Sequence, residues 1–237
     1  MAEPVGIRLM EIFNAIKRMN PSFMGFQSIV NITSKLEFPN EWGLGTSSTL
    51  IAALAEWSGV SAYGLLQKTF GGSGYDLACA NAEGPILYQI HQSAGQYVEV
   101  PYKPAFSDSL FFIYLGKKQN SRDGIQGFRA KGLVPNSIVQ EINQLSLAWL
   151  QASDLTSLEQ IINQHESVVA DYLDLKKAKD LYFQDYWGTV KSLGAWGGDF
   201  VLATSNRSTQ ETAAYFQNKG FNTIFSYQDL LFAQPNS

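Results

Sequence analysis

The sequence predicts an α+β protein of two domains, and three observations lead to this class. A strand pattern over residues 26–38 runs through a glycine-rich turn into a helical pattern over residues 50–57. Beyond residue 106 the patterns follow the order strand, helix, helix, strand, helix, strand, which favours helices on one face of a sheet. Pro101 and Pro104 indicate a boundary between these halves, near residues 101–108.

The strand expected over residues 26–38 depends on strict alternation. Its apolar residues share one parity: Phe26, Val30, Ile32, Leu36 and Phe38. Polar residues occupy the other parity, and this period of two is typical of a half-buried strand.

Other patterns define the remaining elements of the first half. Residues 9–16 have one apolar helical face that ends before Asn20-Pro21. We expect further helices over residues 61–69 and 77–82, and a hairpin with strands 86–90 and 97–100.

The second half begins with an apolar run over residues 110–115 that predicts a strand buried on both faces. Residues 117–132 are polar and are expected to form a loop-rich stretch. Long helices are expected from Pro135 and from Ser153 or Asp154. A strand over 200–204, a helix over 208–218 and a strand over 222–227 complete the expected order.

Composition excludes several classes of function. Of 237 residues, 45% are hydrophobic and 16% charged, with a net charge of −4, so bulk electrostatics attracts neither nucleic acid nor an anionic membrane. Cys79 is the sole cysteine, which rules out an intramolecular disulfide, and the two histidines lie too far apart to suggest zinc. No signal peptide or long apolar run is present. We therefore expect a cytoplasmic protein without nucleic-acid or membrane partners.

The first candidate site is the glycine-rich turn, which reads Gly43, Leu44, Gly45, Thr46, Ser47, Ser48. A strand, a glycine turn and a helix start together direct backbone N–H groups and a positive helix end at one point, which suits a phosphate. The hydroxyls can contact phosphate oxygens or Mg²⁺. The alternative is a tight turn with a Ser/Thr N-cap and no ligand. The stretch matches neither the Walker A loop nor the dinucleotide-binding fingerprint.

Asp76 is the candidate catalytic carboxylate. It follows the flexible stretch Gly71–Tyr75 and opens the helix expected from residue 77. In phosphoryl transfer, a carboxylate so placed orients the attacking hydroxyl and accepts its proton. The alternative is that Asp76 serves only as the N-cap of that helix.

A third glycine cluster precedes the strand expected over residues 200–204. It comprises Gly194, Ala195, Trp196, Gly197 and Gly198. Small residues around one tryptophan suggest a backbone that passes close to a ligand. The alternative is a β-bulge or a tight entry into the strand.

Together the three clusters resemble the GHMP small-molecule kinases. The stretch Pro39–Ser48 resembles the family signature Pro-x-x-x-Gly-Leu-Gly-Ser-Ser-Ala, Gly72–Ala78 resembles its Ser-Gly-x-Asp segment, and Leu193–Asp199 resembles its Gly-Ala-Gly-x-Gly-Gly motif. The order of the three segments also matches, and the likeness covers about residues 5–230.

The resemblance implies roles for these residues. Gly43 to Ser48 would bind the phosphates of ATP, the Ser47 hydroxyl would contact Mg²⁺ or phosphate, and Asp76 would contact the substrate hydroxyl. Substrate would also lie near the third cluster and near Ser121 and Arg122, although Arg122 can equally be a solvated cation.

The resemblance also implies the domain layout. Residues 1–105 would form an N-terminal domain like domain 2 of ribosomal protein S5, carrying the phosphate-binding loop. Residues 106–237 would form a ferredoxin-like C-terminal α/β sandwich. A homodimer is a further expectation.

The chain departs from the family pattern in three ways. Trp196 stands where the family has glycine, which makes the third loop bulkier. Where mevalonate kinases carry a magnesium-binding glutamate before the catalytic aspartate, this chain has Leu65, Leu66 and Gln67. The family's N-terminal strands and their Pro-Gly-Lys-type motif have no counterpart before the first helix, so the N-terminal domain would be truncated and its sheet would expose an edge.

The resemblance therefore implies ATP-dependent phosphoryl transfer to a hydroxyl or phosphate of a small metabolite, namely mevalonate or phosphomevalonate in isoprenoid biosynthesis. One alternative is an ATP-dependent decarboxylase of the same fold, of the mevalonate diphosphate type. The other is a non-catalytic remnant or binding protein that retains the scaffold.

Overall fold

The computed structural model describes residues 4–24, 30–91, 94–117, 121–194, 196 and 199–231. The chain divides into two compact units. Unit 1 comprises residues 1–40 and 44–102, and unit 2 comprises residues 41–43 and 103–237. The short 3₁₀ helix η1 (Asn40–Trp42) and the following glycine belong largely to unit 2, so the first glycine loop contributes residues to both units.

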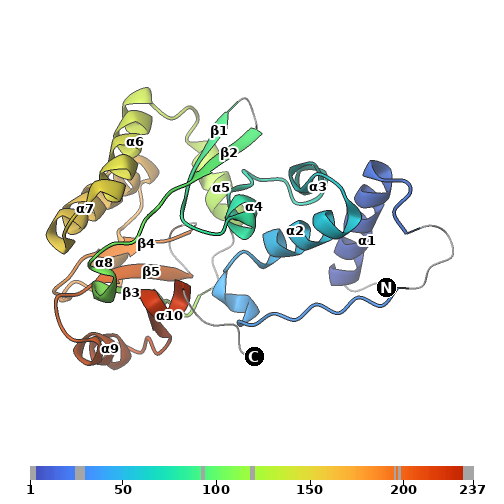
Figure 1. The fold of residues 1–237 in the computed structure, drawn as a ribbon. Helices are drawn as coiled ribbons and strands as arrows, with labels where there is room; N and C mark the ends of the chain where they lie inside the picture. The colour runs from blue at the N-terminus through green and yellow to red at the C-terminus, as the bar shows by residue number, and fades with distance from the viewer. Residues whose placement is uncertain are drawn as a thin grey trace. The chain divides into compact units, whose positions relative to one another are not determined.

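Unit 1 is built from helices around a small apolar core, together with one hairpin (Figure 1). Its helices are α1 (Pro4–Met19), α2 (Thr46–Ser58), α3 (Ala62–Thr69) and α4 (Tyr75–Asn81). Helix α3 packs against α1 and α2, and α2 packs against α4. These helices confirm the apolar periodicity in the sequence, because Ile12, Ile16, Ile51, Leu65 and Leu77 are fully buried in one cluster.

The hairpin of unit 1 pairs β1 (Ile86–His91) with β2 (Ala94–Glu99) in antiparallel register, with Ile86 opposite Glu99 and Tyr88 opposite Tyr97. The predicted hairpin is therefore confirmed, although β2 begins earlier than expected. Its exposed apolar residues include Ile90 and Val98, at 58% and 59%.

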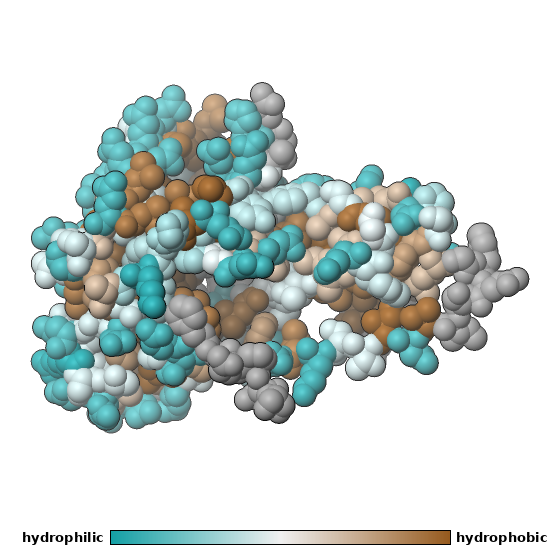
Figure 2. Space-filling model, in the orientation of Figure 1, coloured by the Kyte–Doolittle hydropathy of each residue, from teal (hydrophilic) through white to brown (hydrophobic). Residues whose placement is uncertain are grey.

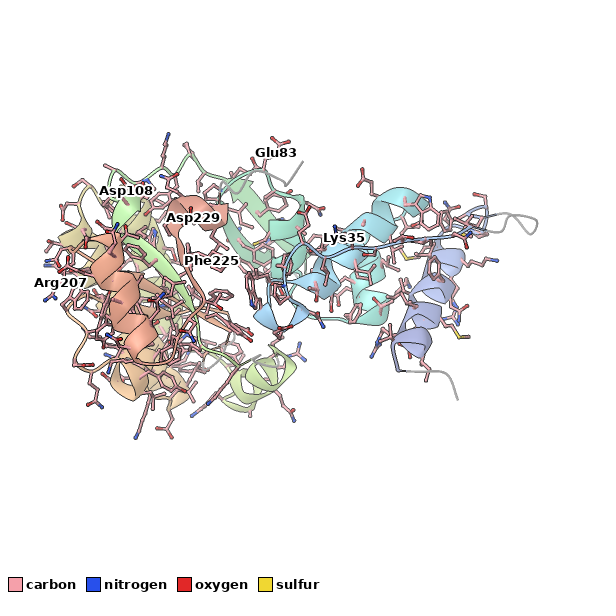
Figure 3. All side chains as sticks on the ribbon, turned by 90° about the horizontal axis from the view of Figure 1, so that it is seen from below. Lys35, Glu83, Asp108, Arg207, Phe225 and Asp229 are labelled. Atoms are coloured by element: carbon pink, nitrogen blue, oxygen red, sulfur yellow. The ribbon has the colours of Figure 1, made fainter. Side chains whose placement is uncertain are left out.

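The strand expected over residues 26–38 is wrong for the part that the structure describes. Residues 30–36 run as a stretched segment without secondary structure (Figure 1) and pair with no strand in the described chain, and Val30, Ile32 and Leu36 are 42%, 52% and 43% exposed. Figure 2 shows hydrophobic surface along this segment, which Figure 3 locates by its label on Lys35. Alternation supplies an apolar face, but a strand also needs a neighbour for its backbone groups.

Unit 2 is built on an antiparallel sheet of order β4-β5-β3-β6. Its strands are β3 (Leu110–Tyr114), β4 (Val190–Ser192), β5 (Phe200–Thr204) and β6 (Ile224–Ser226). In register, Leu110 lies opposite Thr204 and Phe112 opposite both Leu202 and Phe225. The expected central strand is confirmed, since β3 lies between β5 and β6.

Helices cover both faces of this sheet, which corrects the expectation of helices on one face (Figure 1). Phe111 and Ile113 pack with residues of α8 (Ala178–Tyr182) and α9 (Thr209–Asn218). Leu110 and Leu202 pack with residues of α7 (Leu155–Leu173) and α10 (Tyr227–Leu231), with α6 (Asn136–Gln151) alongside. Alternate residues of β3 are apolar on both faces, and burying both requires two helical layers.

Residues 121–130 also differ from the expectation, because they form helix α5 (Ser121–Ala130) rather than a loop. Gly124 and Gly127 weaken the helical signal in this sequence. The structure pairs the Phe128 ring with the Tyr172 ring of α7, 6.0 Å between centroids. A tertiary contact of this kind can override weak local propensity.

Candidate functional site

The first glycine loop ends at an N-terminus that lacks a side-chain cap. Gly45 is the N-cap of the 13-residue helix α2, with φ of 73°, and no side chain caps the helix there. The alternative of a Ser/Thr N-cap is therefore wrong, since Thr46 is the first helical residue. A helix start whose N-cap is a left-handed glycine suits an anion, because the cap residue itself supplies no side-chain oxygen to the first N–H groups of the helix.

The two serines of this loop lie in different surroundings. Ser47 is exposed in the first turn of α2, whereas Ser48 is buried at 9% exposure. A hydroxyl that contacts phosphate or Mg²⁺ must reach the solvent side of the helix. Ser47 therefore fits such a contact better than Ser48.

Asp76 lies next to this loop within unit 1. It is the second residue of α4, whose N-cap is Gly74 with φ of 81°, so the alternative that Asp76 itself caps the helix is wrong. A Cβ built on Gly45 would lie 3.8 Å from the Cβ of Asp76. The structure thus brings the exposed carboxylate-bearing residue of the second motif against the glycine that caps α2.

Within unit 2, the beginning of the first loop packs on the sheet through Trp42. Its ring contacts Phe225 of β6 (labelled in Figure 3) and Phe200 of β5, with centroids 5.2 and 5.9 Å apart. The Tyr114 hydroxyl donates a hydrogen bond to the Glu41 carbonyl oxygen at 3.0 Å. Sequence reasoning missed this anchor, although Trp42 stands inside the quoted signature.

Gly43 lies directly against the third motif in the same unit. Its φ is 68°, and an added Cβ would overlap the carboxylate of Asp199, 2.7 Å from Oδ2. Only glycine fits this close approach. Asp199 is therefore a further functional candidate that sequence reasoning missed, although it ends the quoted third motif.

Backbone hydrogen bonds join Asp199 to Leu115 and to Lys117. The Leu115 N–H donates to the Asp199 carbonyl at 2.7 Å, and the Asp199 N–H donates to the Lys117 carbonyl at 2.6 Å. Asp199 is only 8% exposed and has a φ of 50°, which is rare for a residue with a side chain. These bonds continue the pairing of β3 with β5 beyond the strand ends.

Only part of the third glycine cluster lies in the described chain. A Cβ built on Gly194 would lie 3.7 Å from Oδ2 of Asp199, and Trp196 has a φ of 55°. A bulky side chain in the left-handed region is strained. Ala195, Gly197 and Gly198 lie outside the described residues.

Ser121 and Arg122 form the start of α5, but the structure does not describe their side chains. It neither joins them to the other candidates nor separates them. Their substrate-binding roles stay predictions.

A buried ionic cluster lies behind β4, which leads into the third motif. Glu166 of α7 is 1% exposed, and its Oε2 accepts hydrogen bonds from the N–H and hydroxyl of Ser192, each at 3.0 Å. Lys191 Nζ lies 3.7 Å from its Oε1. Burial raises the pKa of Glu166 and lowers the pKa of Lys191, while each partner's charge opposes the shift.

No protein-family model matches the chain, and no curated protein matches it by sequence. Solved structures do match it. They include L. major mevalonate kinase in complex with R-mevalonate (TM-score 0.56, 18% identity), the Lin0012 protein of Listeria innocua (0.63, 16%) and Streptococcus pneumoniae phosphomevalonate kinase (0.59, 18%). The chain has the fold of the GHMP kinases.

The three alignments differ in coverage. They include 76%, 92% and 92% of this chain and 64%, 76% and 79% of the respective neighbour chains. The chain thus spans somewhat under two thirds of the L. major enzyme. At these identities the likeness concerns the fold alone.

None of the helices in the described residues is long and apolar enough to span a bilayer. Over the same ranges, no group of three or more His, Cys, Asp or Glu side chains could hold a metal ion.

Proposed function

We propose that this chain catalyses ATP-dependent phosphoryl transfer to a small metabolite, with mevalonate or phosphomevalonate as the substrate class. The observation that carries the proposal is the uncapped start of α2 with Asp76 beside its N-cap glycine, 3.8 Å from the Cβ that Gly45 lacks. The GHMP-kinase fold and the names of two structural neighbours support the reaction class.

In this proposal, the loop from Gly43 to Ser48 binds the phosphates of ATP. The residues fit the group at the start of α2: its N-cap is a glycine, which has no capping side chain, and the left-handed Gly45 lets phosphate oxygens approach the backbone. The positive end of the helix dipole, about half an elementary charge, favours the negative phosphates there.

Mg²⁺ also fits this loop, because it usually keeps several waters and takes few protein ligands beside phosphate oxygens. The exposed Ser47 hydroxyl would hold it. Bound there, the ion would neutralise charge on the transferred phosphoryl group.

Asp76 would orient the substrate hydroxyl and accept its proton as that oxygen bonds to the γ-phosphorus of ATP and the bond from this phosphorus to the leaving ADP breaks. We assign substrate contacts to Ser121 and Arg122 and to the third cluster, namely Gly194, Ala195, Trp196, Gly197 and Gly198. The cytoplasmic location, a homodimeric state and the lack of nucleic-acid or membrane partners stay predictions.

The experiment measures ADP formation by the purified chain with ATP, Mg²⁺ and either mevalonate or phosphomevalonate. Asp76→Asn should lower kcat by about 100- to 10,000-fold, because the proton acceptor is lost, and should leave the unfolding midpoint near that of the parent. Glu83→Gln, an exposed carboxylate shortly after α4, is the matched control and should keep full activity.

Other results would favour the alternatives. Release of carbon dioxide from mevalonate diphosphate would identify the decarboxylase. A folded chain that forms no ADP with any of these substrates would support the binding protein. Unchanged turnover by Asp76→Asn would remove the role assigned to this carboxylate.

A further inference from the structure

The loop that leads to Asp76 is held by two tyrosine hydroxyls within unit 1. The hydroxyl of Tyr63, on α3, donates to the Gly74 carbonyl at 3.2 Å. The hydroxyl of Tyr88, on β1, donates to the carbonyl of Ser73. The two hydroxyl oxygens lie 3.5 Å apart, so elements from different parts of the unit fix adjacent peptide groups of one loop.

A third side chain extends this arrangement. Gln67 Nε2 donates to the Gly72 carbonyl at 2.9 Å. The carbonyls of three consecutive residues, Gly72, Ser73 and Gly74, therefore each accept a hydrogen bond from a side chain. Gln67 lies in the region where the family resemblance leads one to expect a magnesium-binding glutamate.

The tyrosines also fill the space around the loop. A Cβ on Gly74 would overlap the Tyr63 ring, with Cδ1 and Cζ at 3.1 Å, and a Cβ on Gly95 of β2 would lie 2.8 Å from Cε1 of the same ring. The Tyr88 ring packs edge-on against Tyr75, the first residue of α4, at 5.6 Å. Contacts this close leave the loop little room to move.

The loop needs such support because its own backbone is permissive. Gly71, Gly72 and Gly74 all have positive φ, and glycine loses more conformational freedom on ordering than other residues. The Gly74 carbonyl that accepts from Tyr63 also accepts the first hydrogen bond of α4, from the Ala78 N–H at 2.9 Å. A shift of this carbonyl would therefore shift the start of the helix that carries Asp76.

We infer that Tyr63 and Tyr88 are positioning residues whose hydroxyls fix the place of Asp76 relative to Gly45. The inference deepens, and rests on, the proposed role of Asp76 in phosphoryl transfer. A tyrosine hydroxyl is protonated at neutral pH and can therefore donate, and burial raises the pKa of Tyr63 further.

The test removes one hydroxyl at a time, in Tyr63→Phe and Tyr88→Phe. Tyr97→Phe is the matched control, because Tyr97 lies on the same hairpin and is 41% exposed. Each loop variant should lower kcat by about tenfold, the effect of one lost hydrogen bond, and should change the KM for ATP by less than about twofold. The control should behave as the parent.

Amide hydrogen exchange gives a second measurement that needs no activity. Peptides covering residues 71–79 should exchange several-fold faster in both loop variants, while those covering α1 keep the rate of the parent. Tyr97→Phe should change neither region.

A third measurement separates positioning from general stabilisation. In the Asp76→Asn background, removal of either hydroxyl should produce no further loss of the residual rate, because the group that it positions is already absent. A full additional tenfold loss would overturn the inference.

The remaining outcomes are also decisive. Unchanged exchange over residues 71–79 would overturn the inference whatever the activity. Faster exchange with full kcat in an active enzyme would show that the hydroxyls only stabilise the loop. If the parent chain forms no ADP, the proposed function fails, and the exchange measurement alone decides whether the two hydroxyls hold the segment of Asp76.

Discussion

Asp76 and Asp199 are two carboxylate residues that each lie against a glycine of the first loop, but the protein holds them differently. Asp76 adjoins Gly45 in unit 1, at the end of a glycine loop fixed by tyrosine and glutamine side chains. Asp199 adjoins Gly43 in unit 2, and its own N–H and C=O extend the pairing of β3 with β5.

This difference concerns which mutations can move each carboxylate. Removal of a single hydroxyl can loosen the segment before Asp76, because side chains supply its hydrogen bonds. The backbone hydrogen bonds of Asp199 use groups that every residue with an N–H possesses, so a substitution of its side chain leaves these bonds available. The two positions therefore predict different sensitivities to substitution.

The largest effect is expected from Gly43→Ala. An alanine at φ of 68° costs about 1–2 kcal/mol, and its Cβ also overlaps the Asp199 carboxylate, for a total loss of about 3–4 kcal/mol in the free energy of unfolding. Gly45→Ala is the matched control: it has a similar φ of 73° but a nearest contact of 3.8 Å, so it should cost only the backbone term. Urea unfolding of both variants measures the difference.

Equal losses in the two alanine variants would contradict the close approach of Asp199 to Gly43. A double variant, Gly43→Ala with Asp199→Gly, should recover part of the loss, because the overlapping carboxylate is gone and glycine also relieves the φ of 50°.

The second largest loss of stability is expected from Glu166→Gln. Glu166 lies behind β4, the strand that leads toward Asp199. Glutamine can still accept from Ser192, but it leaves the Lys191 ammonium buried without a carboxylate, at a cost of about 3 kcal/mol. Thermal or urea unfolding measures the loss. Glu141→Gln, whose carboxylate pairs with Gln164 at the surface, should change stability by less than about 0.5 kcal/mol.

The double variant Glu166→Gln with Lys191→Met sharpens this prediction. If the loss comes from an unpaired charge, removal of that charge should restore most of the stability. A double variant as unstable as the sum of the two single variants would instead indicate that the two side chains act independently.

The smallest effect is expected in the pH dependence of the free energy of unfolding. It comes from His165, which precedes Glu166 on α7. Burial lowers its pKa to about 4, and the Lys191 charge adds to the shift. The unfolded chain binds a proton near pH 6.5 while the folded chain does not, so stability should fall as the pH drops from about 6.5 to 4. After allowance for the partial exposure of the ring, we expect a loss of about 1 kcal/mol between pH 7 and pH 5.

Unfolding measured at both pH values checks this sign. His165→Gln should remove the difference, whereas the exposed His91→Gln should retain it. A chain that gains stability on acidification, and loses that gain with His165→Gln, would contradict the burial of this ring.

The local pattern of apolar residues predicted an element correctly where one face of that element packs on the core of its own unit. The helices α1, α2 and α9 follow the apolar spacing of the sequence, and β3 follows its continuous apolar run. The same logic predicted a strand over residues 26–38 that is wrong for the described residues 30–38, because alternation does not supply a neighbour for the backbone. It also missed α5, because two glycines lower the helix propensity of that segment. The structure shows a tertiary contact between its Phe128 ring and Tyr172 of α7.

The candidate site was predictable in its chemistry but not in its contacts. Glycine clusters and Asp76 stand out by residue type, whereas Trp42, Tyr63 and Tyr88 look like ordinary core aromatics. Their roles depend on which backbone group or ring lies opposite each of them, and no spacing in the sequence encodes that.

By itself, the sequence determined the positions of most helices, the buried central strand and the three glycine clusters in their order. Only the tertiary structure decided that glycine rather than serine or threonine caps α2, that Gly45 meets Asp76 while Gly43 meets Asp199, and that helices cover both faces of the second sheet. The physical reason is the distance in sequence over which each kind of information acts. Periodicity reports which face of its own element a residue occupies. These contacts join residues dozens of positions apart, which meet only after the elements have packed.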